Sequence, residues 1–270
     1  MLKDITFGQY IETKSPIHRA DPRAKIILLI LVIVFIFVCK NVFSLLLSVL
    51  FVLAVIFVSK VPLKMYLKNL KAILPIIIFT ALINMFYGDE NSTVLVEFWK
   101  LSITTDGLYR AFFMATRIIL LIIISSSLTY TTTPNDLTDA IENLLSPLRF
   151  LGLKSAVHTL ALMMTIALRF IPTLVEEAEK IMNAQKARGA DLESGNLKER
   201  IKALIPILIP LLISSVRRAY ELAEAMECRC YNGGEGKTRM KQLRFSKVDL
   251  WLSLVTVMFC CGIVFINIIL

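Results

Sequence analysis

Two arginines that each stand between small residues are the side chains of this sequence best suited to bind a partner. Arg188 and Arg229 each lie close to the end of a predicted helix. A guanidinium can bond both oxygens of a carboxylate at once, and small neighbours let it enter a narrow acidic groove. The helix dipole alone also favours a basic residue at a helix C-terminus, but two matched ends on one chain are harder to explain in this way. The candidate partner-binding residues are Ala187, Arg188, Gly189, Cys228, Arg229 and Cys230.

The rest of the sequence offers no set of residues suited to catalysis, metal binding or nucleotide binding. No GxxxxGK[ST] phosphate-binding loop occurs, the two histidines stand far apart, and the cysteines follow no CxxC spacing. Ser125, Ser126, Ser127 and Thr129 have no nearby histidine or carboxylate, and we expect them to bond helix carbonyls. We therefore expect a non-catalytic protein with no cofactor or metal of its own. If ATP drives its function, ATP and Mg²⁺ bind to a partner chain.

Long blocks without charge predict an all-α integral membrane protein. Hydrophobic residues make up 56% of the chain and its mean hydropathy is +0.70, whereas soluble domains contain roughly 45–50% apolar residues. Blocks of about 20 apolar residues match the thickness of the hydrocarbon core of a bilayer. Residues 1–130 are expected to form a transmembrane region, and residues 248–270 a C-terminal transmembrane helix. The five predicted spans are residues 25–40, 42–59, 72–87, 107–130 and 249–269, with approximate limits.

The basic residues indicate how the chain threads the membrane. The formal net charge is +9, and the cytoplasmic loops of membrane proteins are rich in lysine and arginine. Seventeen basic residues lie in 131–247 and four in 59–71. Five spans then place the N-terminus and residues 131–247 in the cytoplasm and the C-terminus outside. The segment before the first span contains no apolar run typical of a cleavable signal peptide, so we expect none.

Residues 131–247 are expected to fold into a cytoplasmic domain of three helices. Thr133 and Pro134 combine a hydroxyl cap with a proline at the first helical position, which is a typical helix start. Gly189 stands where a C-terminal cap is expected. Two of the helices are long, and each ends in an x-Arg-x motif. The predicted helices are residues 134–150, 153–188 and 199–230, with approximate limits.

Two apolar stretches of this domain, residues 155–175 and 203–216, are hydrophobic enough to enter lipid. If both crossed the membrane, six basic residues of the segment 176–202 would lie in a short external loop, against the usual charge bias. Pro206 and Pro210 would also interrupt the second stretch. We therefore expect both stretches to lie against the cytoplasmic face of the membrane or to dip into it.

Taken together, these motifs resemble the transmembrane T component of energy-coupling factor transporters. The resemblance covers residues 15–265 approximately, and the two x-Arg-x ends carry most of it. One departure stands out, because Cys228 and Cys230 occupy positions where the family usually has alanine and then glycine or serine. Cysteine is small enough to keep the fit. The other similar segments are His18-Arg19-Ala20-Asp21-Pro22-Arg23-Ala24-Lys25, Thr133-Pro134-Asn135-Asp136-Leu137, Arg169-Phe170-Ile171-Pro172 and Glu224-Ala225-Met226-Glu227.

The resemblance implies a coupling subunit of an ATP-driven importer in the cell membrane of a prokaryote. Its partners would be two ABC-type ATPase subunits and a membrane S component that binds a vitamin or related micronutrient. Arg188 and Arg229 would dock into grooves on the two ATPases. Closure of the ATPases on binding ATP would then move the coupling helices and reorient the S component in the bilayer.

A self-contained channel or secondary transporter is the alternative function. Such proteins usually carry ionisable or polar residues inside their spans, and Arg117 and Asn84 are the candidates here. We expect Arg117 to have a structural or subunit-contact role, by pairing with Asp106 or Glu97 or by reaching toward the membrane surface. A nucleic-acid partner is not expected, because the basic residues follow the membrane topology and thirteen acidic residues accompany them in 131–247.

Overall fold

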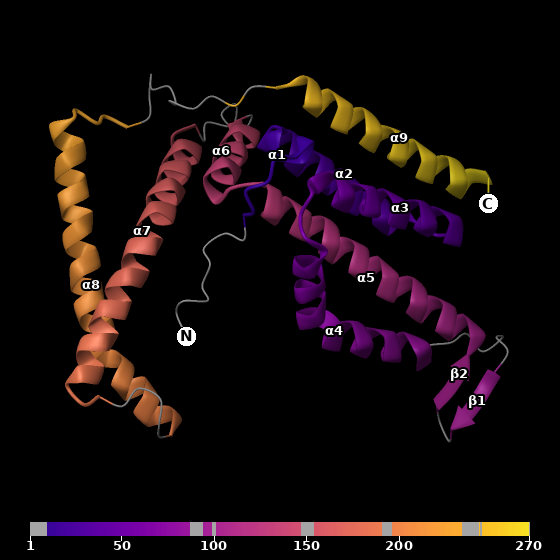
Figure 1. The fold of residues 1–270 in the computed structure, drawn as a ribbon, viewed down its shortest axis with the longest axis horizontal. Helices are drawn as coiled ribbons and strands as arrows, with labels where there is room; N and C mark the ends of the chain where they lie inside the picture. The colour runs from indigo at the N-terminus through magenta and orange to yellow at the C-terminus, as the bar shows by residue number, and fades with distance from the viewer. Residues whose placement is uncertain are drawn as a thin grey trace. The chain divides into compact units, whose positions relative to one another are not determined.

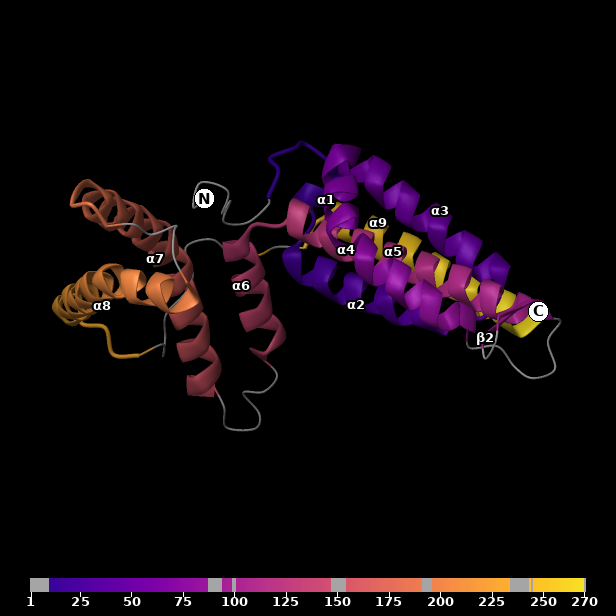
Figure 2. The same ribbon diagram turned by 90° about the horizontal axis from the view of Figure 1, so that it is seen from below.

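Helices form most of the regular structure in the part of the chain that the computed structural model describes, as Figure 1 and Figure 2 show. The described residues are 10–86, 94–98, 101–146, 154–190, 196–233, 243 and 245–269. The predicted all-α membrane fold is confirmed, and a short antiparallel hairpin, which hydropathy did not predict, is added to it. The elements are α1 (Pro16–Arg19), α2 (Pro22–Val38), α3 (Val42–Ser59), α4 (Leu63–Phe86), β1 (Val94–Phe98), β2 (Leu101–Thr104), α5 (Thr105–Thr131), α6 (Pro134–Leu144), α7 (Lys154–Ala187), α8 (Leu197–Cys228) and α9 (Lys247–Ile269).

The contacts within the chain divide it into two units, and the boundary between them lies within α6. The bundle unit consists of residues 8–140 and 242–270, and contains α1 to α5, the hairpin and α9. The crossed-helix unit consists mainly of residues 141–241, and contains α7 and α8.

Apolar residues at helical spacing form the core of the bundle unit. On each of α2, α3, α5 and α9, two of them lie one turn apart and therefore share a helix face. Their side chains form one core, and Figure 1 and Figure 2 both show these helices packing side by side. The core residues with this spacing are Val32, Ile36, Val52, Ile56, Leu120, Ile124, Phe259 and Ile263.

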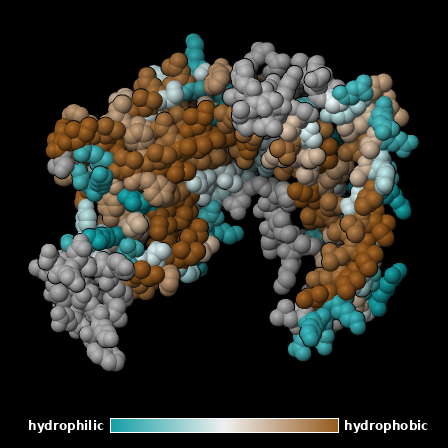
Figure 3. Space-filling model, turned by 180° about the vertical axis from the view of Figure 1, so that it is seen from behind, coloured by the Kyte–Doolittle hydropathy of each residue, from teal (hydrophilic) through white to brown (hydrophobic). Residues whose placement is uncertain are grey.

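The outward face of the bundle unit is hydrophobic as well, which suits contact with lipid. Phe37, Phe57 and Phe265 are all more than half exposed, and Figure 3 shows hydrophobic side chains covering much of the bundle. Within the described ranges, α3, α4, α5, α7 and α9 are long and apolar enough to cross a membrane. Helix α2 coincides with the first predicted span, but its 17 residues cover only about 25 Å at 1.5 Å per residue.

Helix α4 is longer than the third predicted span, because it begins at Leu63 instead of near residue 72. Lys64, Lys68 and Lys71 make its first half resemble a polar loop. They follow one another at i, i+4 and i+7, so they share one helix face and do not interrupt the helix. Pro75 lies inside the helix, and Figure 1 shows α4 bending along its length, as expected for an internal proline.

Arg117 has a structural role inside the bundle unit. Its Nη2 donates to the carbonyl of Cys39, just beyond the end of α2, at 2.7 Å. The guanidinium lies over the rings of Phe37 and Phe113, at 5.8 and 5.0 Å from their centroids. These contacts connect α5 to the end of α2. A backbone carbonyl thus takes the place of the expected acidic partner Asp106.

Candidate partner-binding site

Helix α7 ends in a Schellman motif at the first x-Arg-x sequence. Gly189 has a φ of +86°, in the left-handed region that glycine adopts without steric cost. The N–H of Ala190 donates to the carbonyl of Gln185 at 3.0 Å, and the N–H of Gly189 donates to that of Lys186 at 3.0 Å. This turn ends the helix sharply and leaves Arg188 at its tip.

Helix α8 ends in the same turn at the second x-Arg-x sequence. The N–H of Tyr231 donates to the carbonyl of Met226 at 3.0 Å, and the N–H of Cys230 donates to that of Glu227 at 2.8 Å. Cys230 has a φ of +53°, so a residue with a Cβ holds the left-handed position that Gly189 holds in α7. Each of these groups stands at the same position relative to its arginine as its counterpart in α7. The two motifs therefore match in backbone geometry as well as in sequence.

Both arginines are available to a partner. Both are exposed, and within the described ranges neither guanidinium makes a side-chain hydrogen bond or ion pair, so each keeps its five N–H donors. The charge nearby differs, because Lys186 precedes Arg188 whereas Glu224 and Glu227 precede Arg229. The two motifs lie at separate helix tips, as Figure 1 shows. The exposed residues are Ala187, Arg188, Gly189, Cys228, Arg229 and Cys230.

Helices α7 and α8 cross, and a polar contact joins them (Figure 1). The carboxylate of Glu177 accepts a hydrogen bond from the Ser214 hydroxyl and another from the Arg218 guanidinium, the latter at 2.5 Å. From the crossing, the C-terminal part of each helix continues toward its arginine. This contact was not predicted from the sequence. It could have been found by aligning the two long helices on their arginines, because Glu177 and Arg218 then fall at the same position with opposite charges.

The family-like segment before α2 has a structural role in the bundle unit. Asp21 accepts hydrogen bonds from the backbone N–H and the guanidinium of Arg23, both at 2.9 Å. Asp249, at the start of α9, accepts from the backbone N–H groups of Asp21 and Ser246, both at 2.6 Å. These bonds hold the starts of α2 and α9 together. Asp249 was not identified from the sequence, because backbone groups as partners leave no pattern of residue types.

His18 also serves the fold. Its Nε2 lies 2.9 Å from the carbonyl of Ile11 and must donate to it, so Nδ1 can accept the hydroxyl of Ser15 at 2.6 Å. One neutral tautomer satisfies both contacts. Partial burial lowers the pKa of His18 from its ordinary value of 6.5, which keeps the ring neutral at physiological pH.

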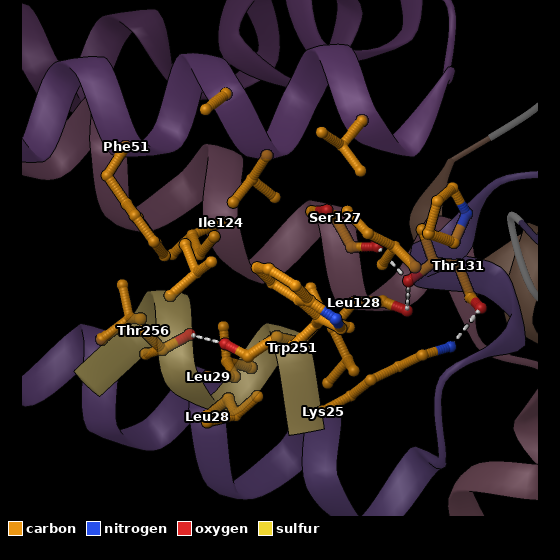
Figure 4. A pocket seen from close by; sticks show the side chains of 18 of the residues that line it. Lys25, Leu28, Leu29, Phe51, Ile124, Ser127, Leu128, Thr131, Trp251 and Thr256 are labelled. Atoms are coloured by element: carbon orange, nitrogen blue, oxygen red, sulfur yellow. Dashed lines mark hydrogen bonds between the residues drawn. The ribbon is translucent and has the colours of Figure 1, made fainter. Parts of the chain in front are cut away.

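A largely apolar cavity of about 300 Å³ lies among α2, α3, α5 and α9 (Figure 4). Phe51 and Trp251 line it together with aliphatic side chains, and Lys25 lies at its edge. The Nζ of Lys25 donates to the carbonyl of Thr131 at 2.9 Å and lies 3.3 Å from the hydroxyl of Thr132. The charge at this cavity is thus already engaged with the end of α5. The cavity suits packing by an apolar group better than binding of a charged substrate.

The chain is similar to known membrane transport proteins over almost its whole length. Residues 13–240 match the family CbiQ, described as cobalt transport protein. The energy-coupling factor transporter transmembrane protein EcfT of Ruminiclostridium cellulolyticum is 52% identical over 264 residues, which cover 98% of this chain and 97% of that protein. EcfT of Clostridium kluyveri is 50% identical over 261 residues, covering 97% and 96%. EcfT of Bacillus subtilis is 44% identical over 250 residues, covering 92% and 93%.

Proposed function

The chain belongs to the CbiQ/EcfT family of transporter membrane proteins, and we propose that it is the coupling subunit of an energy-coupling factor importer. In this role it transmits the ATP-driven motion of two cytosolic ABC-type ATPases to a substrate-binding S component in the membrane. The cargo is a vitamin or a related micronutrient. ATP and Mg²⁺ bind to the ATPases, and this chain performs no catalysis.

The matched arginine tips of α7 and α8 carry this proposal. Two helix ends with matching backbone geometry on one chain are suited to two similar grooves, as a pair of related ATPases would present. Each tip exposes a guanidinium beyond the last helical turn, where it can bond a carboxylate bidentately. The left-handed turn at Gly189 or Cys230 ends each helix directly after its arginine.

The bundle unit supplies the membrane part of the function. Its outward face is rich in exposed apolar side chains such as Phe57 and Phe265, which suit both lipid and the apolar surface of another membrane subunit. In the proposed orientation the N-terminus and residues 131–247 face the cytoplasm, where the ATPases are. The C-terminus faces outside.

Arg117 disfavours the alternative of a self-contained channel or secondary transporter. An ionisable residue that serves a transport pathway faces a water-filled cavity or an exchangeable partner. The guanidinium of Arg117 is instead engaged with the carbonyl of Cys39 and the rings of Phe37 and Phe113. Its role in joining α5 to α2 accounts for its presence in the membrane.

A pull-down from detergent-solubilised membranes of the host tests the proposed function. The wild-type chain is expected to recover two ABC-type ATPases, and the double variant Arg188→Ala/Arg229→Ala is expected to lose them. Loss of two charge-assisted contacts of about 1.5–3 kcal/mol each weakens binding by about a hundredfold or more. Raising the salt concentration during washing should also weaken the recovery of ATPases by the wild-type chain, because the arginine contacts are ionic.

Lys180→Ala/Arg217→Ala is the matched control, since it removes two exposed cations from the same two helices. It should leave ATPase recovery at the wild-type level. Equal loss in both double variants would show a general charge effect and reject the assignment of the arginines. Failure of the wild-type chain to recover any ATPase would reject the coupling function.

A further inference from the structure

The contact between Glu177 and Arg218 lies at the same distance along the chain from both arginine tips. Glu177 is eleven residues before Arg188, and Arg218 is eleven residues before Arg229. At 1.5 Å per helical residue, each C-terminal arm extends about 16 Å beyond this contact. The contact therefore joins positions of the two helices that are equivalent when counted back from their arginines.

The charges of the two helices are complementary when α8 is aligned on α7 so that Arg229 matches Arg188. Glu177 and Arg218, which form the ion pair between the helices, are one such aligned pair, and identical charges there would repel. The sequence has opposite charges at each aligned charged pair near the crossing and along the arms. These pairs are Glu176 and Arg217, Glu177 and Arg218, Lys180 and Glu221, and Lys186 and Glu227.

Both arms are built to be stiff. Residues 178–187 and 219–228 contain no proline and no glycine, and are rich in strong helix formers such as alanine, glutamate and lysine. The prolines inside these helices, Pro172, Pro206 and Pro210, all come before the crossing. Bending in α7 and α8 is therefore expected upstream of the contact, while the arms move as rods.

The contact fixes the rotation of α8 as well as its position along α7. Ser214 donates to one carboxylate oxygen of Glu177 and Arg218 donates to the other, and the two donors lie one turn apart on one face of α8. A shift of α8 by one residue would move it about 1.5 Å and rotate it by about 100°, which breaks both bonds. The side chains of Arg218 and Glu177 are 37% and 22% exposed, so such a pair adds little to the stability of the fold. Its effect is to fix the position and rotation of α8 on α7.

We propose that Glu177, Ser214 and Arg218 are positioning residues that set the crossing point of α7 and α8, so that both arginine tips reach their ATPases together. This inference rests on the proposed function. Loss of the contact lets the helices slide or rotate against each other. Each arginine can then still bind an ATPase, but the motion of the two ATPases is no longer delivered in step to the membrane part.

A charge exchange tests this proposal in the complete transporter reconstituted in vesicles. Glu177→Arg and Arg218→Glu each place like charges at the crossing, and each should lower ATP-driven uptake about fivefold or more, in line with the usual coupling of contacting residues. The exchange Glu177→Arg/Arg218→Glu restores opposite charges and should recover most of the uptake. Recovery of ATPases in a pull-down should stay at the wild-type level in all three variants.

Distances between spin labels measure the geometry directly. Ala184→Cys and Ala225→Cys are exposed, equivalent positions one turn before the tips. They are labelled in a background of Cys228→Ala, Cys230→Gly and Cys261→Ser, which removes the other exposed thiols. The wild-type pair should give one narrow distance distribution, each single charge variant a broad one, and the exchange a narrow one again.

The exchange Glu176→Arg/Arg217→Glu is the matched control, because it moves the same charges at positions next to the pair. It should leave the distances and uptake unchanged. Wild-type distances and uptake in Glu177→Arg and Arg218→Glu would overturn the inference, as would an equal loss in the control. If the wild-type chain recovers ATPases while these variants behave as wild type, only this inference fails and the proposed coupling function stands.

Discussion

At the scale of single residues, the two x-Arg-x motifs differ most at their third position. Gly189 and Cys230 both have a positive φ, and no heavy atom outside the local chain lies within 4 Å of a Cβ built on Gly189. The cost of a side chain there is thus conformational and comes from the backbone alone. A residue with a Cβ costs about 1 kcal/mol in this region relative to glycine. Cys230 bears this cost in the native protein.

Substitutions at these positions should have opposite effects. Gly189→Ala is expected to weaken the last turn of α7 by about 1 kcal/mol, and Cys230→Gly to strengthen the last turn of α8 by a similar amount. Hydrogen exchange of the amides of Ala190 and Tyr231, which close the two turns, should report faster and slower exchange respectively.

Gly233→Ala provides the control, since Gly233 has a φ of +75° and open space around it but lies outside both motifs. It should introduce similar local strain and leave hydrogen exchange at the amide of Ala190 unchanged. Equal exchange rates at Tyr231 before and after Cys230→Gly would show that the cysteine carries no strain.

Residue types alone were enough to select the two arginines and their small neighbours as candidates. Their exposure agrees with a partner-binding role, which stays a prediction. Residue types did not predict Asp249 or Glu177. Asp249 bonds the backbone N–H groups of Asp21 and Ser246, and backbone donors are the same at every position. Glu177 stands among other acids on α7, and only the crossing of the helices shows which of them has a partner.

At the scale of elements, glycine allows two helices of the bundle unit to approach closely. A Cβ on Gly107 of α5 would lie 2.5 Å from the carbonyl oxygen of Met85 in α4, a backbone atom that cannot turn aside. A Cβ on Gly262 of α9 would lie 3.1 Å from a methyl group at the end of Leu47 in α3, which can rotate away. An added methyl group is therefore accommodated more easily at Gly262 than at Gly107.

Gly107→Ala is expected to separate the ends of α4 and α5 and to lower stability by about 2 kcal/mol, as overpacking usually does. Gly262→Ala should change stability by less than about 1 kcal/mol because a side chain absorbs the added methyl group. Thermal unfolding of the purified proteins in the same detergent compares them. A larger loss in Gly262→Ala than in Gly107→Ala would contradict this account of the packing.

The helices could be predicted from hydropathy where charges are absent, as in α3 and α9, whose observed limits agree with the prediction to within a few residues. The prediction of α4 was too short since three lysines on one face look like a loop when hydropathy is averaged along the chain. The hairpin of β1 and β2 was missed because its strands, of five and four residues, are too short to show a clear alternation. The division into membrane and cytoplasmic parts stays a prediction.

At the scale of the whole molecule, the native cysteines can report which side of the membrane α8 faces. Cys228 and Cys230 are exposed at its tip, whereas Cys39 and Cys260 are buried. A membrane-impermeant maleimide should leave Cys228 and Cys230 unlabelled in intact cells. It should label them in inverted vesicles stripped of peripheral proteins, because residues 131–247 are predicted to be cytoplasmic.

Two engineered cysteines control this experiment in the background Cys228→Ala/Cys230→Gly/Cys261→Ser. Lys40→Cys, beyond the end of α2, should react from outside intact cells, and Lys60→Cys, after α3, only in inverted vesicles; both lysines are exposed. Labelling of Cys228 and Cys230 in intact cells would reverse the proposed orientation.

The contact between α7 and α8 has a mechanical consequence. Because Glu177 bonds two residues of α8 at once, α8 cannot slide along α7 without breaking both bonds. On the proposed function, a force applied at either arginine tip is then passed to the other helix instead of being lost in sliding between them. The two ATPases would therefore act on one linked body and not on two independent helices.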